Sequence, residues 1–180
     1  QAGLFREAEH PPFADRDCTT CHAAPGAADP FALVARQDEL CGECHQDQVD
    51  ESRDAAFPHM SAGGTECTAC HNPHTGDGGS LLKGTTEAVC LGCHDPGGGK
   101  SGLPGRYLGH ADGVDCTACH EPHGGSQPLL MRGESIGAVC VTCHEHQHGI
   151  RHPQGEDVKD PRSGQPMDCT SCHGLHDAPF

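Results

Sequence analysis

The sequence of 180 residues contains no tryptophan and one tyrosine, and it is poor in aliphatic residues. Leu, Ile, Val and Phe together make up about 14% of the chain, which is below the roughly 20% under which a strongly charged chain is expected to stay disordered. Glycine and proline account for 25 and 14 residues. Burial of apolar side chains alone cannot offset the entropy that such a chain loses on folding. Either the chain is disordered, or something other than side chains fills its core.

Long apolar runs and positive charge are also scarce. No apolar run approaches the about 20 residues of a transmembrane helix, and no segment alternates as a strand does. Asp and Glu number 26 against 11 Lys and Arg, which gives a formal net charge of −15. This charge disfavours binding to nucleic acid or to an anionic membrane. It suits a basic or metal-bearing partner, or it serves solubility alone.

Cysteine, by contrast, is abundant and regular. Fourteen cysteines form seven CxxC pairs with none left over, and a histidine directly follows each pair. The cysteines are Cys18, Cys21, Cys41, Cys44, Cys67, Cys70, Cys90, Cys93, Cys116, Cys119, Cys140, Cys143, Cys169 and Cys172. The histidines are His22, His45, His71, His94, His120, His144 and His173.

Three interpretations of this pattern compete. A disulfide scaffold needs no histidine, and a CxxC loop is too short to link distant segments. Zinc sites use CxxC pairs but do not need histidine after every second cysteine. The third interpretation, CxxCH as the attachment site of c-type haem, explains every residue of all seven motifs. The sequence therefore predicts seven haem c groups.

The spacing has a mechanical reason. Two sulfurs three residues apart lie on one face of a helical turn, where they can reach the two vinyl groups of one porphyrin. The next residue then ligates the iron as the proximal ligand. Seven haems leave about 26 residues for each. We therefore expect mostly irregular coil with short α-helices, wrapped around a stacked chain of haems, with little or no β-sheet.

The motifs repeat along the chain. The first cysteines at 18, 67, 116 and 169 are separated by 49, 49 and 53 residues. We expect one heptahaem domain over 1–180, with repeat units at about 10–45, 59–94 and 110–144 and a C-terminal half unit at 146–180. A short helix should end at the second motif of each unit, with Thr85 and Ser135 as N-caps.

Nine further histidines lie outside the CxxCH motifs. Six follow the repeat and are the expected distal ligands: His10, His59, His74, His110, His123 and His176. His146, His148 and His152 are weaker candidates, because they crowd into one short stretch. His123 cannot reach the distal face of the iron that His120 ligates, so we expect it to serve a neighbouring haem, the other one of its own unit.

The paired motifs, with their "CHNPH" and "CHEPH" elements, resemble the doubled-CXXCH multihaem c-type cytochromes over residues 10–176. Members of that family include periplasmic electron carriers and extracellular cytochromes that polymerise into haem filaments, known as nanowires. Their haems typically stack in alternating parallel and T-shaped pairs. The resemblance implies that His74 and His123 are distal ligands within their haem pairs. In some filament formers, a histidine of one subunit ligates a haem of the next.

The two ends of the chain depart from the repeat. Pro25 stands where the other units have the second histidine, and the last half unit has His176 but no second motif. One end thus lacks a ligand that the other has in excess. We expect His176 to ligate a haem of the next subunit in a head-to-tail filament. The alternative is a discrete soluble carrier in which residues 146–152 supply the missing ligand.

The expected function is long-range electron transfer, because iron held by two histidines has no open position for a substrate. The rival is a multihaem reductase with one open haem. Such an enzyme often has a variant motif such as CxxCK, and none occurs here. Redox proteins, minerals and metal ions are the expected partners. Haem attaches to CxxCH outside the cytoplasm, so we expect export to the extracellular space or, alternatively, the periplasm. Gln1 is expected to be a mature, cleaved N-terminus.

Overall fold

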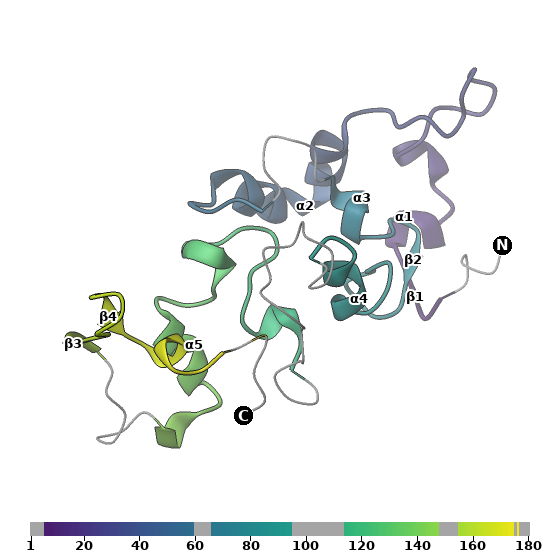
Figure 1. The fold of residues 1–180 in the computed structure, drawn as a ribbon. Coiled ribbons are helices and arrows are strands. Elements are labelled where there is room, and N and C mark those ends of the chain that lie inside the picture. The colour runs from purple at the N-terminus through teal and green to yellow at the C-terminus, as the bar shows by residue number, and fades with distance from the viewer. Residues whose placement is uncertain (1–5, 60–65, 95–113, 148–154, 175, 177–180) are drawn as a thin grey trace.

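The structure, a computed structural model, describes residues 6–59, 66–94, 114–147, 155–174 and 176 (Figure 1). Coil and turns dominate, which confirms the predicted fold class. The helices are α1 (Pro11–Ala14), α2 (Gln37–Asp54), α3 (Cys67–Cys70), α4 (Thr86–Leu91) and α5 (Ile136–Val141). Short 3₁₀ turns are η1 (Cys18–Thr20), η2 (Cys116–Ala118), η3 (Pro128–Leu130), η4 (Glu145–Gln147) and η5 (Cys169–Ser171). Among the described residues, no helix is long and apolar enough to cross a membrane.

Each CxxCH motif forms a single helical turn. In the motif of η1, the backbone N–H of His22 donates to the carbonyl of Cys18 at 2.9 Å. The corresponding bonds in the motifs that begin at residues 67, 90, 116, 140 and 169 measure 2.8 to 3.0 Å. The seventh motif therefore has the same backbone geometry as the others. Such a turn brings both sulfurs to one side and directs the histidine away from the helix end.

The N-caps predicted for the second motifs are confirmed. The side chain of Thr85 accepts a hydrogen bond from the N–H of Ala88, and that of Ser135 accepts one from Ala138. In the first unit, Arg36 precedes α2 and makes no side-chain cap. That helix also continues past its motif to Asp54, with a kink at His45 (φ −115°, ψ 42°). The kink interrupts the helix at the histidine, after which polar helix-forming residues resume it.

Two small antiparallel sheets contain the strands. β1 (Ala8–Glu9) pairs with β2 (Thr75–Gly76), and β3 (Gly155–Lys159) pairs with β4 (Pro166–Met167). The first sheet joins the segment before the first motif to the second repeat unit. One repeat later, Phe57 and Gly125 exchange two backbone hydrogen bonds at 3.0 and 3.1 Å. Equivalent backbone pairings, one 49-residue repeat apart, thus join the first unit to the second and the second unit to the third.

The polypeptide has almost no apolar core of its own. Of the apolar residues that the structure describes, only Met131 and Val139 are buried, whereas Phe31 and Leu129 are 81% and 79% exposed. A chain of this size that folds on side-chain burial would place many more such residues inside. The observation agrees with a core that is filled by something other than side chains.

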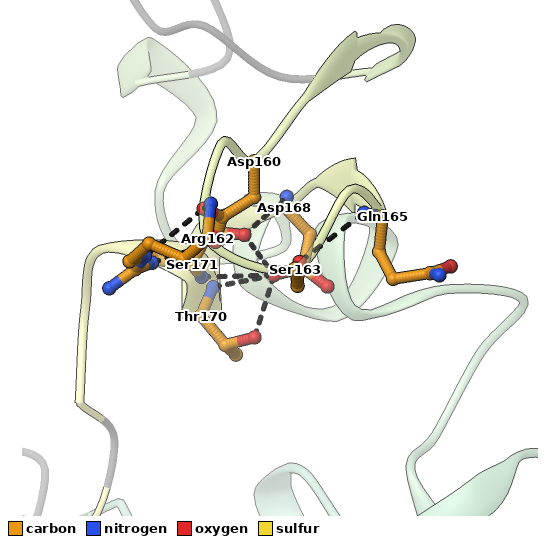
Figure 2. A network of polar contacts seen from close by, with 7 residues as sticks. All are labelled: Asp160, Arg162, Ser163, Gln165, Asp168, Thr170 and Ser171. Carbon is orange, nitrogen blue, oxygen red and sulfur yellow. Dashed lines mark hydrogen bonds and ion pairs between the residues drawn. The ribbon is translucent and has the colours of Figure 1, made fainter.

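A polar network supports the seventh motif (Figure 2). The buried carboxylate of Asp160 accepts two hydrogen bonds from the guanidinium of Arg162, at 3.0 and 2.8 Å, and Arg162 also donates to the carbonyl of Ser171. Asp168 and Ser171 form a capping box at the start of η5. The network therefore links the β3–β4 hairpin to the turn that carries Cys169 and Cys172.

Candidate functional site

Ten histidines of the described residues form five pairs. In each pair, a CxxCH histidine faces a histidine from elsewhere in the chain, with ring centres 5.8 to 6.0 Å apart. The pairs are His22 with His74, His45 with His10, His71 with His123, His94 with His59, and His120 with His176.

This separation fits a metal between the two rings. A ligating imidazole nitrogen lies about 2 Å from its metal, so two rings on opposite sides of one ion have centres about 6 Å apart. Aromatic pairs in general have ring centres about 4.5 to 7 Å apart, so the recurrence of this spacing at five CxxCH histidines, rather than one distance alone, points to a metal. Beside each pair lie the two free thiols of the same CxxCH turn. The donor set therefore suits a haem iron with two histidine ligands and two covalent anchors.

Backbone carbonyls fix the orientation of the proximal rings. The Nδ1–H groups of His22, His71 and His120 donate to the carbonyls of the residues nine positions further on, at 3.0, 2.7 and 2.8 Å. A carbonyl can only accept, so the proton is on Nδ1 and the lone pair on Nε2 is available to a metal. Each of these turns is held in place by a bridge to the residue eleven positions on, as between His71 and Leu82.

Carbonyls of the next repeat unit orient two of the distal rings. Nδ1 of His59 lies 2.8 Å from the carbonyl of Pro122, and His10 makes the equivalent contact with Pro73. Burial, and then the imidazole of His45, lowers the pKa of His10; burial, and then His22, lowers the pKa of His74. The neutral form, which ligates metals, is favoured at both positions. Sequence reasoning did not identify these prolines, although their repeated place in "CHNPH" and "CHEPH" is a signal.

The expected partner of His123 is wrong. His123 faces His71, the first CxxCH histidine of the preceding unit, rather than the second one of its own unit. His74 likewise faces His22 across a unit boundary. The cause is the backbone pairing of Phe57 with Gly125 and of β1 with β2, which places each CHxxH element against the unit before it.

The bridging of subunits by His176 stays a prediction, and His176 already has a neighbouring ring within its own chain. Its ring faces that of His120 in the same chain, with a centre separation of 6.0 Å and an interplanar angle of 19°. His176 therefore does for the third unit what His123 does for the second. Pro25 stands at the corresponding position of the first unit.

Four candidate ligands are not placed against a partner by these contacts. His110, His148 and His152 lie outside the described residues. His146 lies in η4 and is exposed. Their roles stay predictions. His144 and His173 follow attachment turns of the same geometry as the other motifs.

Contacts between thiols place the attachment motifs in sequence order. Cys41 and Cys67, from consecutive units, are in hydrogen-bond contact, and burial followed by this neighbour raises the pKa of Cys41 to about 11. Cys90 with Cys116, and Cys140 with Cys169, repeat this arrangement. Within units, the electrostatic neighbours are Cys21 and Cys44, Cys70 and Cys93, and Cys119 and Cys143. Each motif therefore adjoins the one before it and the one after it.

All fourteen cysteines lie within the described residues, and none forms a disulfide. In the same part of the chain, no three His, Cys, Asp or Glu side chains converge on one point where a metal ion could be held. The cysteines instead come in pairs, each pair in the turn that carries one CxxCH histidine. This geometry differs from that of a structural zinc site, which gathers four ligands around one ion.

Comparison with known proteins agrees with this description. The model of the doubled CXXCH motif matches residues 10–50, 59–99 and 110–149, which together make up about two thirds of the chain. A search of curated proteins finds no match. Paired CXXCH motifs bind haem c, and its attachment implies export from the cytoplasm and a role in electron transfer. The chain belongs to the doubled CXXCH family and is a multihaem c-type cytochrome.

Proposed function

We propose that the chain conducts electrons through seven haems c, one at each CxxCH motif, each held between two histidines. The facing of five CxxCH histidines with five other histidines at 5.8 to 6.0 Å carries this proposal. The family match covers the first six motifs. The seventh motif supports the proposal through its backbone turn, in which the N–H of His173 donates to the carbonyl of Cys169 at 3.0 Å.

The remaining two ligand pairs follow from the repeat. His10 precedes His45 by 35 residues and His59 precedes His94 by 35, so His110, which precedes His144 by 34, takes the sixth site. Residues His146, His148 and His152 are the candidates for the seventh site, opposite His173. This assignment gives every iron two ligands from within one chain.

A haem supplies a one-electron redox centre. The residues of this chain anchor it, set the orientation of both axial rings through backbone carbonyls, and leave no iron position open to a substrate. An electron carrier needs these features, whereas a reductase needs one open site. The contacts between successive CxxC pairs favour a single unbranched path that follows the order of the motifs.

For the assembly, we retain the extracellular head-to-tail filament as the proposal, with a discrete periplasmic carrier as the alternative. The first motif, next to α1, and the last, next to the β3–β4 hairpin, lie at opposite ends of the molecule (Figure 1). End-to-end contact would then continue the path without any exchange of ligands. The strongly anionic composition favours a basic protein or a metal-bearing acceptor as redox partner.

One set of measurements tests the proposal. Intact-mass spectrometry should show seven attached haems, and the absorption spectrum should be low-spin throughout. The reduced native protein should bind no carbon monoxide. A high-spin band or carbon monoxide binding would instead indicate an open, enzyme-like site. Negative-stain electron microscopy of the same sample should show uniform fibres, and dispersed particles of monomer size would identify the discrete carrier.

A further inference from the structure

The environment of His123 differs from that of five other paired histidines. Nδ1 of His123 lies 3.7 Å from Oε2 of Glu51, a carboxylate. Five other paired rings direct Nδ1 at neutral backbone carbonyls: His10, His22, His59, His71 and His120. A negative charge beside the outer nitrogen of a ligating imidazole attracts its proton and makes the ring a stronger donor to the metal.

The approach of Glu51 to His123 is built into the fold. Glu51 lies in α2, in the part of the helix that follows the kink at His45. Gly124 packs against the end of this helix, because a Cβ added there would come within 2.6 Å of the Cβ of Ala55 and 3.4 Å of the carbonyl of Glu51. Gly124 also has φ +135°, which side chains rarely adopt. The residue after Gly124, Gly125, is held by its backbone pairing with Phe57.

The surroundings do not neutralise this carboxylate. Glu51 lines a cavity of about 350 Å³ together with Asp54 and Glu121, and no basic residue is among those that line it. One repeat further on, the position of Glu51 in the sequence is occupied by Lys100. The sequence repeat therefore does not place a carboxylate at the equivalent position of the second unit.

We propose that Glu51 is a positioning residue that lowers the reduction potential of the iron held between His71 and His123, below the potentials of irons with carbonyl-oriented histidines. The inference rests on the proposed bis-histidine ligation. A stronger donor and a nearby negative charge both stabilise ferric iron, which has one more positive charge than ferrous iron. Reduction of this site by one electron from its neighbour is thus made less favourable. The third of the seven haems then has a lower reduction potential than its neighbours, so transfer of an electron to it is energetically uphill.

The test is a potentiometric titration of the intact holoprotein and of Glu51→Gln, followed by visible absorption. In Glu51→Gln, roughly one seventh of the reduction amplitude should move to higher potential. One low-spin signal in the electron paramagnetic resonance spectrum should shift, because the donor strength of one axial ring changes. Glu51→Asp, which keeps the charge on a shorter side chain, should move the titration back towards that of the original protein.

The matched control is Asp54→Asn, which removes a carboxylate from the same helix and the same cavity. Its titration should follow that of the unsubstituted protein. The inference is overturned if Glu51→Gln titrates like the original protein, or if Asp54→Asn shifts the same amplitude as far. Failure of the proposed function would look different: the unsubstituted protein would carry fewer than seven haems or show a high-spin band.

Discussion

The environment of single histidines explains most of what this chain can do. A CxxCH histidine offers one nitrogen to one face of an iron, and the opposite face needs a second ring from elsewhere in the chain. His22 and His71 keep their protons on Nδ1 through backbone carbonyls, so Nε2 is already available to the metal. Because the acceptors are main-chain carbonyls, these hydrogen bonds do not depend on which side chains stand at the accepting positions.

The pairing of His71 with His123 predicts the outcome of a double substitution. His71→Ala and His123→Ala should each leave one iron with an open position, which binds one carbon monoxide per reduced protein. Because both rings serve the same iron, the double variant should still bind only about one. Binding is measured by titrating the reduced holoproteins and following the Soret band.

The control for this experiment is His74→Ala combined with His123→Ala, since these histidines face His22 and His71 of different units. That variant should bind about two molecules of carbon monoxide. If His71→Ala with His123→Ala also binds two, the cross-unit pairing is contradicted.

Register in the sequence identified six of the histidines as candidate ligands, and the structure pairs all five of the six that it describes. The sequence register could not identify the CxxCH histidine that His123 faces. The partner lies 52 residues earlier in the chain, and the sequence spacing alone favours the nearer His144. The deciding interaction is the backbone pairing of Phe57 with Gly125, which involves no distinctive side chain.

At the scale of elements, the CxxCH turns and the helix caps follow from local sequence. Thr85 and Ser135 were predictable because a side-chain acceptor precedes each short helix. The extension of α2 beyond its motif was not predicted, because the kink at His45 separates it from the motif helix. The β3–β4 hairpin depends on the ion pair of Asp160 with Arg162, whose local pattern resembles an ordinary turn.

This ion pair predicts that the hairpin is sensitive to acid. The hydrogen bonds from Arg162 hold the pKa of Asp160 below its usual value. The stabilisation is therefore fully present above the usual aspartate pKa of about 3.9 and is lost as the pH falls through the lower pKa of the folded state. In Arg162→Gln most of this stabilisation is absent, so its hairpin should open more than that of the original protein above a pH of about 3.9, and the difference should shrink as the pH falls. Cleavage between residues 155 and 168 by pepsin, which is active in acid, measures the opening.

Arg53→Gln is the matched control, since Arg53 forms an exposed ion pair with Asp50 on α2 at 3.2 Å. Its pepsin cleavage in the hairpin should match that of the original protein. Equal cleavage of all three proteins across the acid range would show that the Asp160–Arg162 pair does not hold the hairpin.

At the scale of the whole molecule, the charge of −15 should govern encounters with redox partners. Reduction of the oxidised holoprotein by a cationic ruthenium ammine complex should slow as salt rises from about 10 to about 200 mM, because screening weakens the attraction. Oxidation of the reduced holoprotein by anionic ferricyanide should accelerate over the same range. Stopped-flow absorbance measures both rates. Identical salt dependence for the two reagents would show that charge does not steer the encounter.

The repeat itself was predictable at this scale, since motifs 49 residues apart are visible in the sequence. The ligand partner of the histidine near its C-terminal end was not predictable from the sequence. Pro25 suggested a missing histidine ligand at one end and His176 an extra one at the other, which a second subunit would balance. In the structure, each CHxxH histidine faces the first CxxCH histidine of the preceding unit, which the sequence repeat alone does not reveal.

Because each CHxxH histidine faces the unit before it, the number of haems in the chain can change by whole repeats. The first two boundaries use the same backbone pairing. Deleting residues 67–115, one 49-residue step, would place His123 opposite His22 and His59 opposite His144, while His10 and His45 keep their partners. We expect a shorter protein with five low-spin haems, as counted by intact mass and absorption. Lengthening by duplication of the same segment follows the same rule, so a gene that repeats or loses one such segment changes the span of the wire without stranding an iron.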